Sequence, residues 1–324
     1  CQKNPGHSQF IPIKHFSELH IPDIYQQIHR TVNAEKFKVK DDLIPFKEFR
    51  NLLYHFVMVM ASLTVNVQIS FTSLDRPDTV PNDPTTPYSG NELRGQRKTR
   101  TASGFIFSSS LVDEGQSKAC PECPSSPGRV HAVFFMQTAT HNLFDAEELK
   151  HSKCLLDYDE ESDRSKLKSI EPVEIVMKDI ENDVCIVKCV TDDETLCKVL
   201  RERLKSYHRL RETIYQILKA KKVVYVRDYV TSFWSIVDLV FVVGHPHGKP
   251  KMVSVGHRIK RLGQGSVSSK SSYLYDTCTC PGSSGGPVYI IGAPNEFIQH
   301  SHSGALDEGN FCGDGVWEQK VQGG

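Results

Sequence analysis

A serine stands among glycines in the segment 280–287, Cys-Pro-Gly-Ser-Ser-Gly-Gly-Pro, and the apolar run 288–291 follows it directly. A tight turn that leads into a buried strand can present the hydroxyl of Ser284 where no neighbouring Cβ obstructs a substrate carbonyl. Because Gly282 has no side chain, its backbone N–H and that of Ser284 can point at a developing negative charge, as in an oxyanion hole. Taken alone, the segment is also consistent with a glycine-rich hairpin.

Two upstream segments favour the catalytic interpretation. His141 follows one apolar stretch, and Asp183 opens another. A serine hydroxyl is a weak nucleophile at neutral pH and needs a base. The base needs a buried carboxylate that holds its tautomer and stabilises its charged form. The chain order His141, Asp183, Ser284 supplies all three groups.

The motifs Thr-Ala-Thr-His, Asn-Asp-Val-Cys-Ile-Val and Gly-Ser-Ser-Gly-Gly-Pro together resemble the three signature segments of the chymotrypsin/trypsin-like serine protease superfamily. The resemblance covers about residues 63–316, and the serine motif is its most specific part. It implies an all-β fold of two six-stranded barrels, a chymotrypsin-like double β-barrel. His141 and Asp183 would come from the first barrel and Ser284 from the second, with the site between them.

The resemblance also implies a mechanism. Ser284 would attack the peptide carbonyl, His141 would take and return the proton, Asp183 would orient His141, and the N–H groups of Gly282 and Ser284 would hold the oxyanion. Ser303 stands where family members often place a serine that hydrogen-bonds the aspartate. We therefore expect a serine endopeptidase that acts on protein or peptide substrates through an acyl-enzyme and needs no metal or organic cofactor.

Two other functions stay open. A protease fold whose cleft is blocked, by N-terminal helices or by a long insert, can serve as a catalytically silent binding or scaffold protein. Alternatively, hydrolysis could be confined to the protein's own processing. Labelling by an active-site-directed reagent distinguishes an active site from a silent one.

The residues around the nucleophile resemble the non-zymogen branch, HtrA-like or glutamyl-endopeptidase-like, more than trypsin itself. Where trypsin-like members carry an aspartate that binds a basic side chain, this chain has Cys278. Thr279, together with His302 directly before Ser303, is similar to the branch that cleaves after glutamate, where a hydroxyl and an imidazole bind the substrate carboxylate. The alternative is that His302 packs in a strand end and the pocket takes a small or apolar residue.

The sequence also lacks the signs of activation by cleavage. In zymogens of the family, an aspartate directly before the nucleophile pairs with a newly released N-terminus, whereas here that position is the uncharged Ser283. Arg100 is followed by Thr101, and no Ile-Val-Gly-Gly-like start follows it. We expect the oxyanion loop to form in the uncut chain, held by other contacts.

Residues 1–62 are expected to be a helical extension outside the protease pattern. Pro22 and Asp23 are placed to open a short helix. A second helix is predicted after Pro45, because apolar residues spaced by three and four share one face: Phe46, Phe49, Leu52, Leu53, Phe56 and Met60. We expect it to pack on the barrel, and a propeptide or partner-binding arm is the alternative.

The protease domain is expected to cover residues 63–316 and to leave 317–324 as a tail. Its first barrel would take about 63–190 and its second about 221–316. Between them, about residues 192–220 are predicted to form an amphipathic helix that bridges the two halves, because apolar residues recur every three or four positions: Leu196, Leu200, Leu204, Tyr207, Leu210, Ile214 and Leu218. Alternation of apolar with polar residues over 65–71 predicts a strand buried on one face. Short apolar runs between Gly/Pro turns favour further strands at 102–107, 130–136, 223–226, 239–243, 252–256 and 288–291.

Three loop segments allow more than one interpretation. The proline-rich stretch 76–90 is predicted to be an extended loop, and the basic run 94–100 after it is a solvated loop or a processing site. Cys120 and Cys123 form a C-x-x-C pair for which a local disulfide or unpaired thiols are favoured over a zinc site. The Gly-His-Pro-His-Gly segment, 244–248, is predicted to be a turn between strands rather than a ligand site.

The ten cysteines leave the compartment open, because a thiol in an apolar strand packs as a small hydrophobe. The family resemblance implies one disulfide, Cys280 to Cys312. The bridge that relatives often place beside the catalytic histidine is missing, because Asn142 follows His141. Localisation stays undecided, with secretion the favoured alternative.

Charge and hydropathy exclude some partners. The chain has 39 Lys plus Arg and 39 Asp plus Glu, so its net charge is zero. A neutral balance gives no electrostatic reason to expect nucleic acid or an anionic membrane as the main partner. The longest apolar run is shorter than the roughly 20 residues that a bilayer span needs, so no transmembrane segment is expected.

Overall fold

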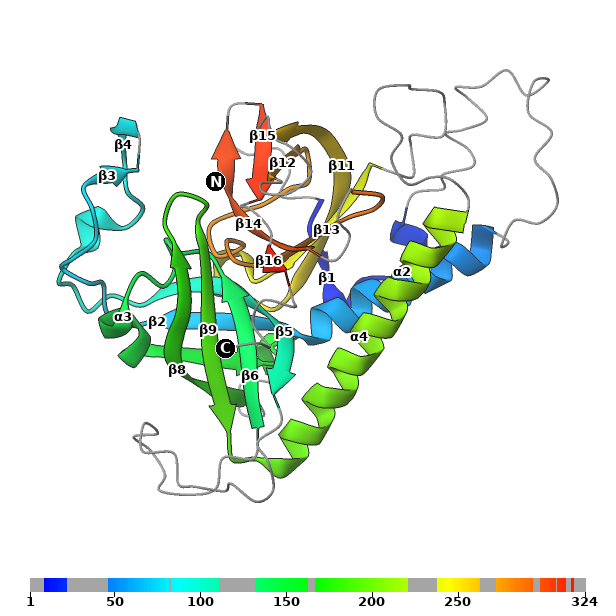
Figure 1. Ribbon diagram of the computed structural model, residues 1–324, viewed down its shortest axis with the longest axis horizontal. Helices are drawn as coiled ribbons and strands as arrows, with labels where there is room; N and C mark the ends of the chain where they lie inside the picture. Colours follow the sequence, from blue (N-terminus) through cyan, green and yellow to red (C-terminus); the bar gives the residue numbers. More distant parts are fainter. Residues whose placement is uncertain are drawn as a thin grey trace.

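Two closed antiparallel β-barrels and a pair of long helices make up the computed structural model (Figure 1). The strands of each barrel are continuous in sequence, the first barrel preceding the second. The structure describes residues 9–21, 46–81, 83–110, 132–162, 167–220, 238–262, 272–293, 298–306, 308–312 and 316–317.

The first barrel closes in the strand order β2-β5-β6-β9-β8-β7. These strands are β2 (Thr64–Ile69), β5 (Arg100–Ser110), β6 (Ala132–Thr138), β7 (Ser152–Leu156), β8 (Lys168–Asp179) and β9 (Val184–Thr191). Pairing of β2 with both β5 and β7 closes the ring. Strand β2 is shorter than the predicted run 65–71. It is buried on both faces rather than on one, because β10 of the second barrel lies against it.

The second barrel closes because β11 pairs with both β10 and β12, which completes the ring β10-β13-β14-β15-β12-β11. Its strands are β10 (Leu239–Gly244), β11 (Met252–Leu262), β12 (Ser272–Tyr275), β13 (Pro287–Ile290), β14 (Ile298–Leu306) and β15 (Gly309–Cys312). Two short strands, β1 (Ile11–Pro12) and β16 (Val316–Trp317), add to β11 and β14. The predicted all-β double barrel is confirmed.

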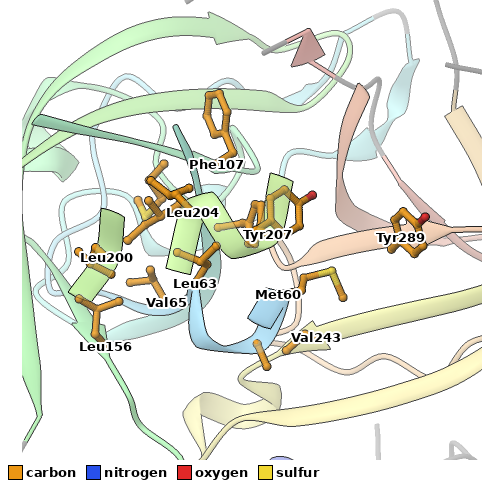
Figure 2. Close-up of a cluster of buried hydrophobic side chains, with 14 of the residues drawn as sticks. Met60, Leu63, Val65, Phe107, Leu156, Leu200, Leu204, Tyr207, Val243 and Tyr289 are labelled. Atoms are coloured by element: carbon orange, nitrogen blue, oxygen red, sulfur yellow. The ribbon is translucent and has the colours of Figure 1, made fainter. Parts of the chain in front are cut away.

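The helices α2 (Phe46–Ser62) and α4 (Glu194–Ala220) lie side by side against the barrels (Figure 1). Figure 2 shows Leu204 and Tyr207 of α4 among side chains of both barrels. Tyr207 is buried against the ring of Phe105 in β5, and its hydroxyl donates to Gln299 Oε1 in β14 at 2.7 Å. The inserted helix therefore bridges the two halves, as its apolar spacing predicted.

Short elements complete the chain. These are α3 (Ala146–Lys150), the hairpin of β3 (Thr79–Val80) with β4 (Asp83–Pro87), and the 3-10 turns η2 (Ile13–His15), η3 (Glu18–His20), η5 (Asn91–Leu93) and η7 (Pro246–Gly248). The predicted extended loop 76–90 thus contains a small hairpin. The basic run ends inside β5, where Arg100 pairs with Glu148 and is only 17% exposed at its side chain, so this arginine is not in a solvated loop.

The expected disulfide between Cys280 and Cys312 is wrong, because both residues are thiols in the structure. Cys312 belongs to the apolar interior of the second barrel, where its Sγ lies 3.8 Å from the carbonyl oxygen of Tyr273. Three other predicted features lie outside the described residues: the helix from Pro22, the Cys120–Cys123 pair and the strand 223–226. Of the helices that the structure describes, none combines the length and apolar character that a membrane span requires.

Candidate active site

His141 and Asp183 lie next to each other at one end of the first barrel. His141 is in the turn after β6 and Asp183 directly precedes β9, and these strands pair so that Thr138 lies opposite Cys185. Asp183 Oδ2 is 2.7 Å from His141 Nδ1, and Oδ1 accepts the His141 backbone N–H at 3.0 Å. One carboxylate thus holds both the ring and the backbone of His141, with the Nδ1 proton facing Asp183 and Nε2 left as the basic nitrogen.

The backbone of Asp183 has a positive φ of 54°, a left-handed conformation that aspartate tolerates better than most residues. Ser303 Oγ donates a further hydrogen bond to Asp183 Oδ2. Burial opposes the charged form of Asp183, but the attraction of His141 and the hydrogen bonds from His141 and Ser303 outweigh it and hold its pKa below the usual value. The carboxylate is therefore ionised at neutral pH and can stabilise a positively charged imidazole.

Ser284 reaches this pair from the second barrel. Its Oγ donates to the carbonyl oxygen of Ser303 at 3.2 Å, while the hydroxyl of Ser303 binds Asp183. Ser284 is half-buried, and rotation about its χ1 bond moves Oγ among its staggered positions without moving the backbone. The structure thus brings Ser284, Ser303, Asp183 and His141 together where the two barrels meet.

The peptide groups around Ser284 are held by their carbonyl oxygens. Pro281 O accepts the N–H of His247 at 2.6 Å, and Ser283 O accepts the N–H of Gly286 at 3.0 Å. In a planar trans peptide the N–H points opposite to the carbonyl, so these two bonds also set the directions of the Gly282 and Ser284 N–H groups. Among the backbone hydrogen bonds of the described residues, neither N–H is used as a donor, as an oxyanion hole requires.

At Gly282 the conformation of this loop demands glycine. Its φ is +96°, and a Cβ there would lie 2.5 Å from His245 O and 2.9 Å from His247 N. The turn η7 thus lies directly against the candidate oxyanion loop. The sequence predicted the turn at 244–248, but not that a backbone N–H within it holds this loop.

Ser103 is a second contributor that sequence reasoning missed. It lies in β5 of the first barrel, and its Oγ donates to Gly282 O at 2.7 Å and its N–H donates to Ser284 O at 2.9 Å. The same Oγ accepts the N–H of His245 at 2.8 Å. A small residue beside Gly104 in a strand is the only sequence signal for it, and that signal is not specific.

The expected pocket residues lie in the second barrel. His302 is 3% exposed, and the Tyr275 hydroxyl lies 2.8 Å from its Nδ1. Burial, and then the charge of His141, lowers the pKa of His302 to about 3, so its imidazole is neutral at physiological pH. Thr279 Oγ1 donates to Asn310 Oδ1 at 2.6 Å, and Cys278 Sγ lies 3.0 Å from Gln9 Oε1.

The strand pairing of both barrels, with these residues where the barrels meet, decides the fold. The chain has the chymotrypsin-like protease fold. No protein-family model and no curated protein matches the sequence. Nor does any group of His, Cys, Asp and Glu in the described part of the chain have the arrangement of a metal site.

Among solved structures, the chymotrypsin-like chain is similar to the active form of the Rv3671c protease from M. tuberculosis, with 14% identity and a TM-score of 0.39, over 83% of this chain and 81% of that one. It is also similar to the HtrA-type protease AlgW with a decapeptide, with 13% identity and a TM-score of 0.39, over 80% of this chain and 63% of AlgW.

Proposed function

We propose that the chain is a serine endopeptidase. The observation that carries this proposal is the continuous set of contacts from His141 through Asp183 and Ser303 to Ser284, beside two N–H groups with set directions. In this mechanism His141 Nε2 takes the proton of Ser284 Oγ as the oxygen attacks the substrate carbonyl, and Asp183 stabilises the charged imidazole. The N–H groups of Gly282 and Ser284 stabilise the oxyanion, and His141 gives the proton to the leaving amine as the peptide C–N bond breaks. Water, deprotonated by His141, then attacks the acyl-enzyme and releases the acid while Ser284 regains its proton.

A fluorophosphonate probe tests the proposal directly, because it reacts only with an activated serine. We expect one modified residue, Ser284, to be found by peptide mass spectrometry of the labelled protein. A Ser284→Ala variant should remain unlabelled. If the wild-type chain is unlabelled while its circular dichroism shows a folded protein, the endopeptidase proposal is refuted.

One observation favours the second candidate, a silent protease fold that binds partners. In the structure, the hydroxyl of Ser284 donates to a backbone carbonyl instead of to His141. Hydrogen bonds of catalytic groups are often long or poorly aligned before substrate binds, which is why this geometry does not decide against catalysis. The same probe separates the candidates, because a silent site leaves Ser284 unmodified.

The intact chain should hydrolyse peptides without prior cleavage. The contacts of Pro281, Gly282 and Ser284 with His247 and Ser103 already hold the oxyanion loop, and none of them needs a new N-terminus. Cutting after Arg100 would also break β5, whose first residue is Arg100. Turnover of a fluorogenic peptide by chain that remains a single band on a denaturing gel checks this. Activity that appears only after clipping near Arg100 contradicts it.

We further propose that the His302 side chain binds the side chain of the substrate residue on the acyl side of the cleaved bond. The tautomer in which Nδ1 accepts from the Tyr275 hydroxyl carries the ring proton on Nε2, and this N–H can donate to an oxygen of glutamate or glutamine. Profiling of a mixed peptide library should therefore show cutting after these two residues. His302→Ala should reduce the preference by about 10- to 100-fold.

The pH dependence of this preference is a separate test. Because the pKa of His302 is about 3, its charge does not change above pH 5, and the ratio of Glu to Gln cleavage should be level from pH 5.5 to 8. The matched control is His257→Ala, which removes an exposed histidine of β11. Dominant cutting after Arg, Lys or large aromatic residues refutes the assignment.

A further inference from the structure

Asn142, the residue after His141, connects the two barrels beside the candidate site. Its side chain is buried, with 6% of the residue exposed. The carboxamide Nδ2 donates to Ser284 O at 2.9 Å and to Thr138 Oγ1 at 3.2 Å. Both hydrogens of the amide are therefore used, one within the turn that carries His141 and one on the backbone of Ser284.

The carbonyl group of Ser284 is held entirely from the first barrel. Its oxygen accepts from Asn142 Nδ2 at 2.9 Å and from the Ser103 N–H at 2.9 Å, which together use its two lone pairs. The other end of the same peptide group, the Gly285 N–H, donates to His302 O at 2.7 Å. The peptide that follows the nucleophile is thus tied at both ends, and Asn142 supplies the only side-chain bond among these three.

The peptide groups on the two sides of Asn142 are held by two guanidinium groups. Arg76 Nη1 donates to His141 O at 2.9 Å, and Arg100 Nη1 donates to Asn142 O at 3.2 Å. Both arginines pair with Glu148, at 2.6 Å for Arg76 and 3.0 Å for Arg100. The turn that carries His141 is therefore anchored to the first barrel. The hydrogen bond from Asn142 Nδ2 to Ser284 O fixes the backbone of Ser284 relative to this turn.

We propose that Asn142 is a positioning residue that sets where Ser284 stands relative to His141. The proposal rests on the proposed function, because it gives Asn142 a role in catalysis only if Ser284 is the nucleophile. The base and the nucleophile come from different barrels, so a small shift between barrels changes the distance between them. A displacement of about 1 Å at a reacting group can lower a rate by about 100-fold.

Two variants test this role. Asn142→Ala removes the amide, and Asn142→Asp keeps its shape but, when ionised, offers only acceptors to the Ser284 carbonyl. We expect each to lower kcat and the rate of fluorophosphonate labelling by about 10- to 100-fold at a temperature where both remain folded. KM should change little, because Asn142 contacts the backbone carbonyl of Ser284 and is not among the residues proposed to bind substrate.

The matched control is Gln137→Met. Gln137 is also buried, and its Nε2 donates across the barrels to Ser301 Oγ at 3.2 Å, but it binds neither His141 nor Ser284. If Asn142 only stabilises the contact between barrels, both substitutions should lower the unfolding midpoint and leave the labelling rate of the folded protein unchanged. The positioning role is supported if folded Asn142→Ala is labelled more slowly than the wild type while folded Gln137→Met is labelled at the wild-type rate.

The outcomes also separate this inference from the proposed function. A wild-type chain that is folded but unlabelled refutes both. A wild-type chain that is labelled, together with folded Asn142 variants labelled at the same rate, refutes the positioning role alone. Near-ultraviolet circular dichroism of each variant establishes that it is folded, and if Asn142→Ala does not fold, the isosteric Asn142→Asp decides the question.

Discussion

Replacing Ser284 or His141 with alanine should lower kcat for peptide hydrolysis by about 10⁶-fold, because nucleophile and base act as a unit. Replacing both should cost little more than replacing either one, for the same reason. Asp183→Asn should lower kcat by about 10⁴-fold, because an amide can hold the ring in the wrong tautomer. Kinetics with a fluorogenic peptide, measured on each purified variant, check these expectations.

The fold should survive these substitutions. Ser284 is half-buried, and the side chain of His141 is 18% exposed, so neither belongs to the packed core. Circular dichroism spectra and thermal midpoints of the single variants should therefore stay close to those of the wild type. Unchanged turnover by purified Ser284→Ala would refute the assignment of the nucleophile, whatever its effect on stability.

Replacing Glu148 with methionine should lower the free energy of unfolding by about 3–5 kcal/mol, the cost of leaving buried charge without its partner. The side chains of Glu148 and Arg76 are fully buried. Arg76→Met should cost less, because Glu148 Oε2 still binds Arg100 at 3.0 Å, whereas loss of Glu148 leaves two guanidinium groups without their carboxylate. Urea unfolding followed by circular dichroism measures the difference.

A nearby surface pair provides the control for the buried one. Lys150 and Glu147 form an ion pair on the same short helix as Glu148, but their side chains are 65% and 55% exposed. Lys150→Ala should leave the unfolding midpoint unchanged, since exposed ion pairs contribute little. In the double variant Arg76→Met/Glu148→Met, part of the lost stability should return. Equal effects of the Glu148 and Lys150 substitutions would contradict this account.

Much of the fold could be predicted because it depends on local patterns. The spacing of apolar residues in α4 and of strand-forming runs such as 239–243 is repeated along the chain and does not depend on distant partners. The turn chemistry of the segment 280–287 is local in the same way. These patterns were enough to predict an all-β chain and, with His141 and Asp183 preceding the serine segment, to choose candidate site residues. The double barrel itself was predicted from the resemblance of these segments to the chymotrypsin/trypsin-like family.

Cysteine pairing could not be predicted in the same way. The family pattern suggested a bridge from Cys280 to Cys312, but Cys312 faces the apolar interior of the second barrel. Which way a thiol points depends on how the strands close around it, and this closure is a property of the whole sheet. The identity of the residue alone is therefore not enough to assign a bridge.

The sequence alone thus predicted the short strands and the inserted helix, because periodicity and turn residues act over short distances. The two barrels followed from the family resemblance of the segments that carry the three candidate catalytic groups. Tertiary structure decided which polar groups support the site. Asn142 meets Ser284 across 142 residues of chain, and Arg76 meets Glu148 across 72. The first of these bonds depends on how the two closed barrels pack against each other, and the second on how distant loops of the first barrel come together. No local spacing in the sequence encodes either arrangement.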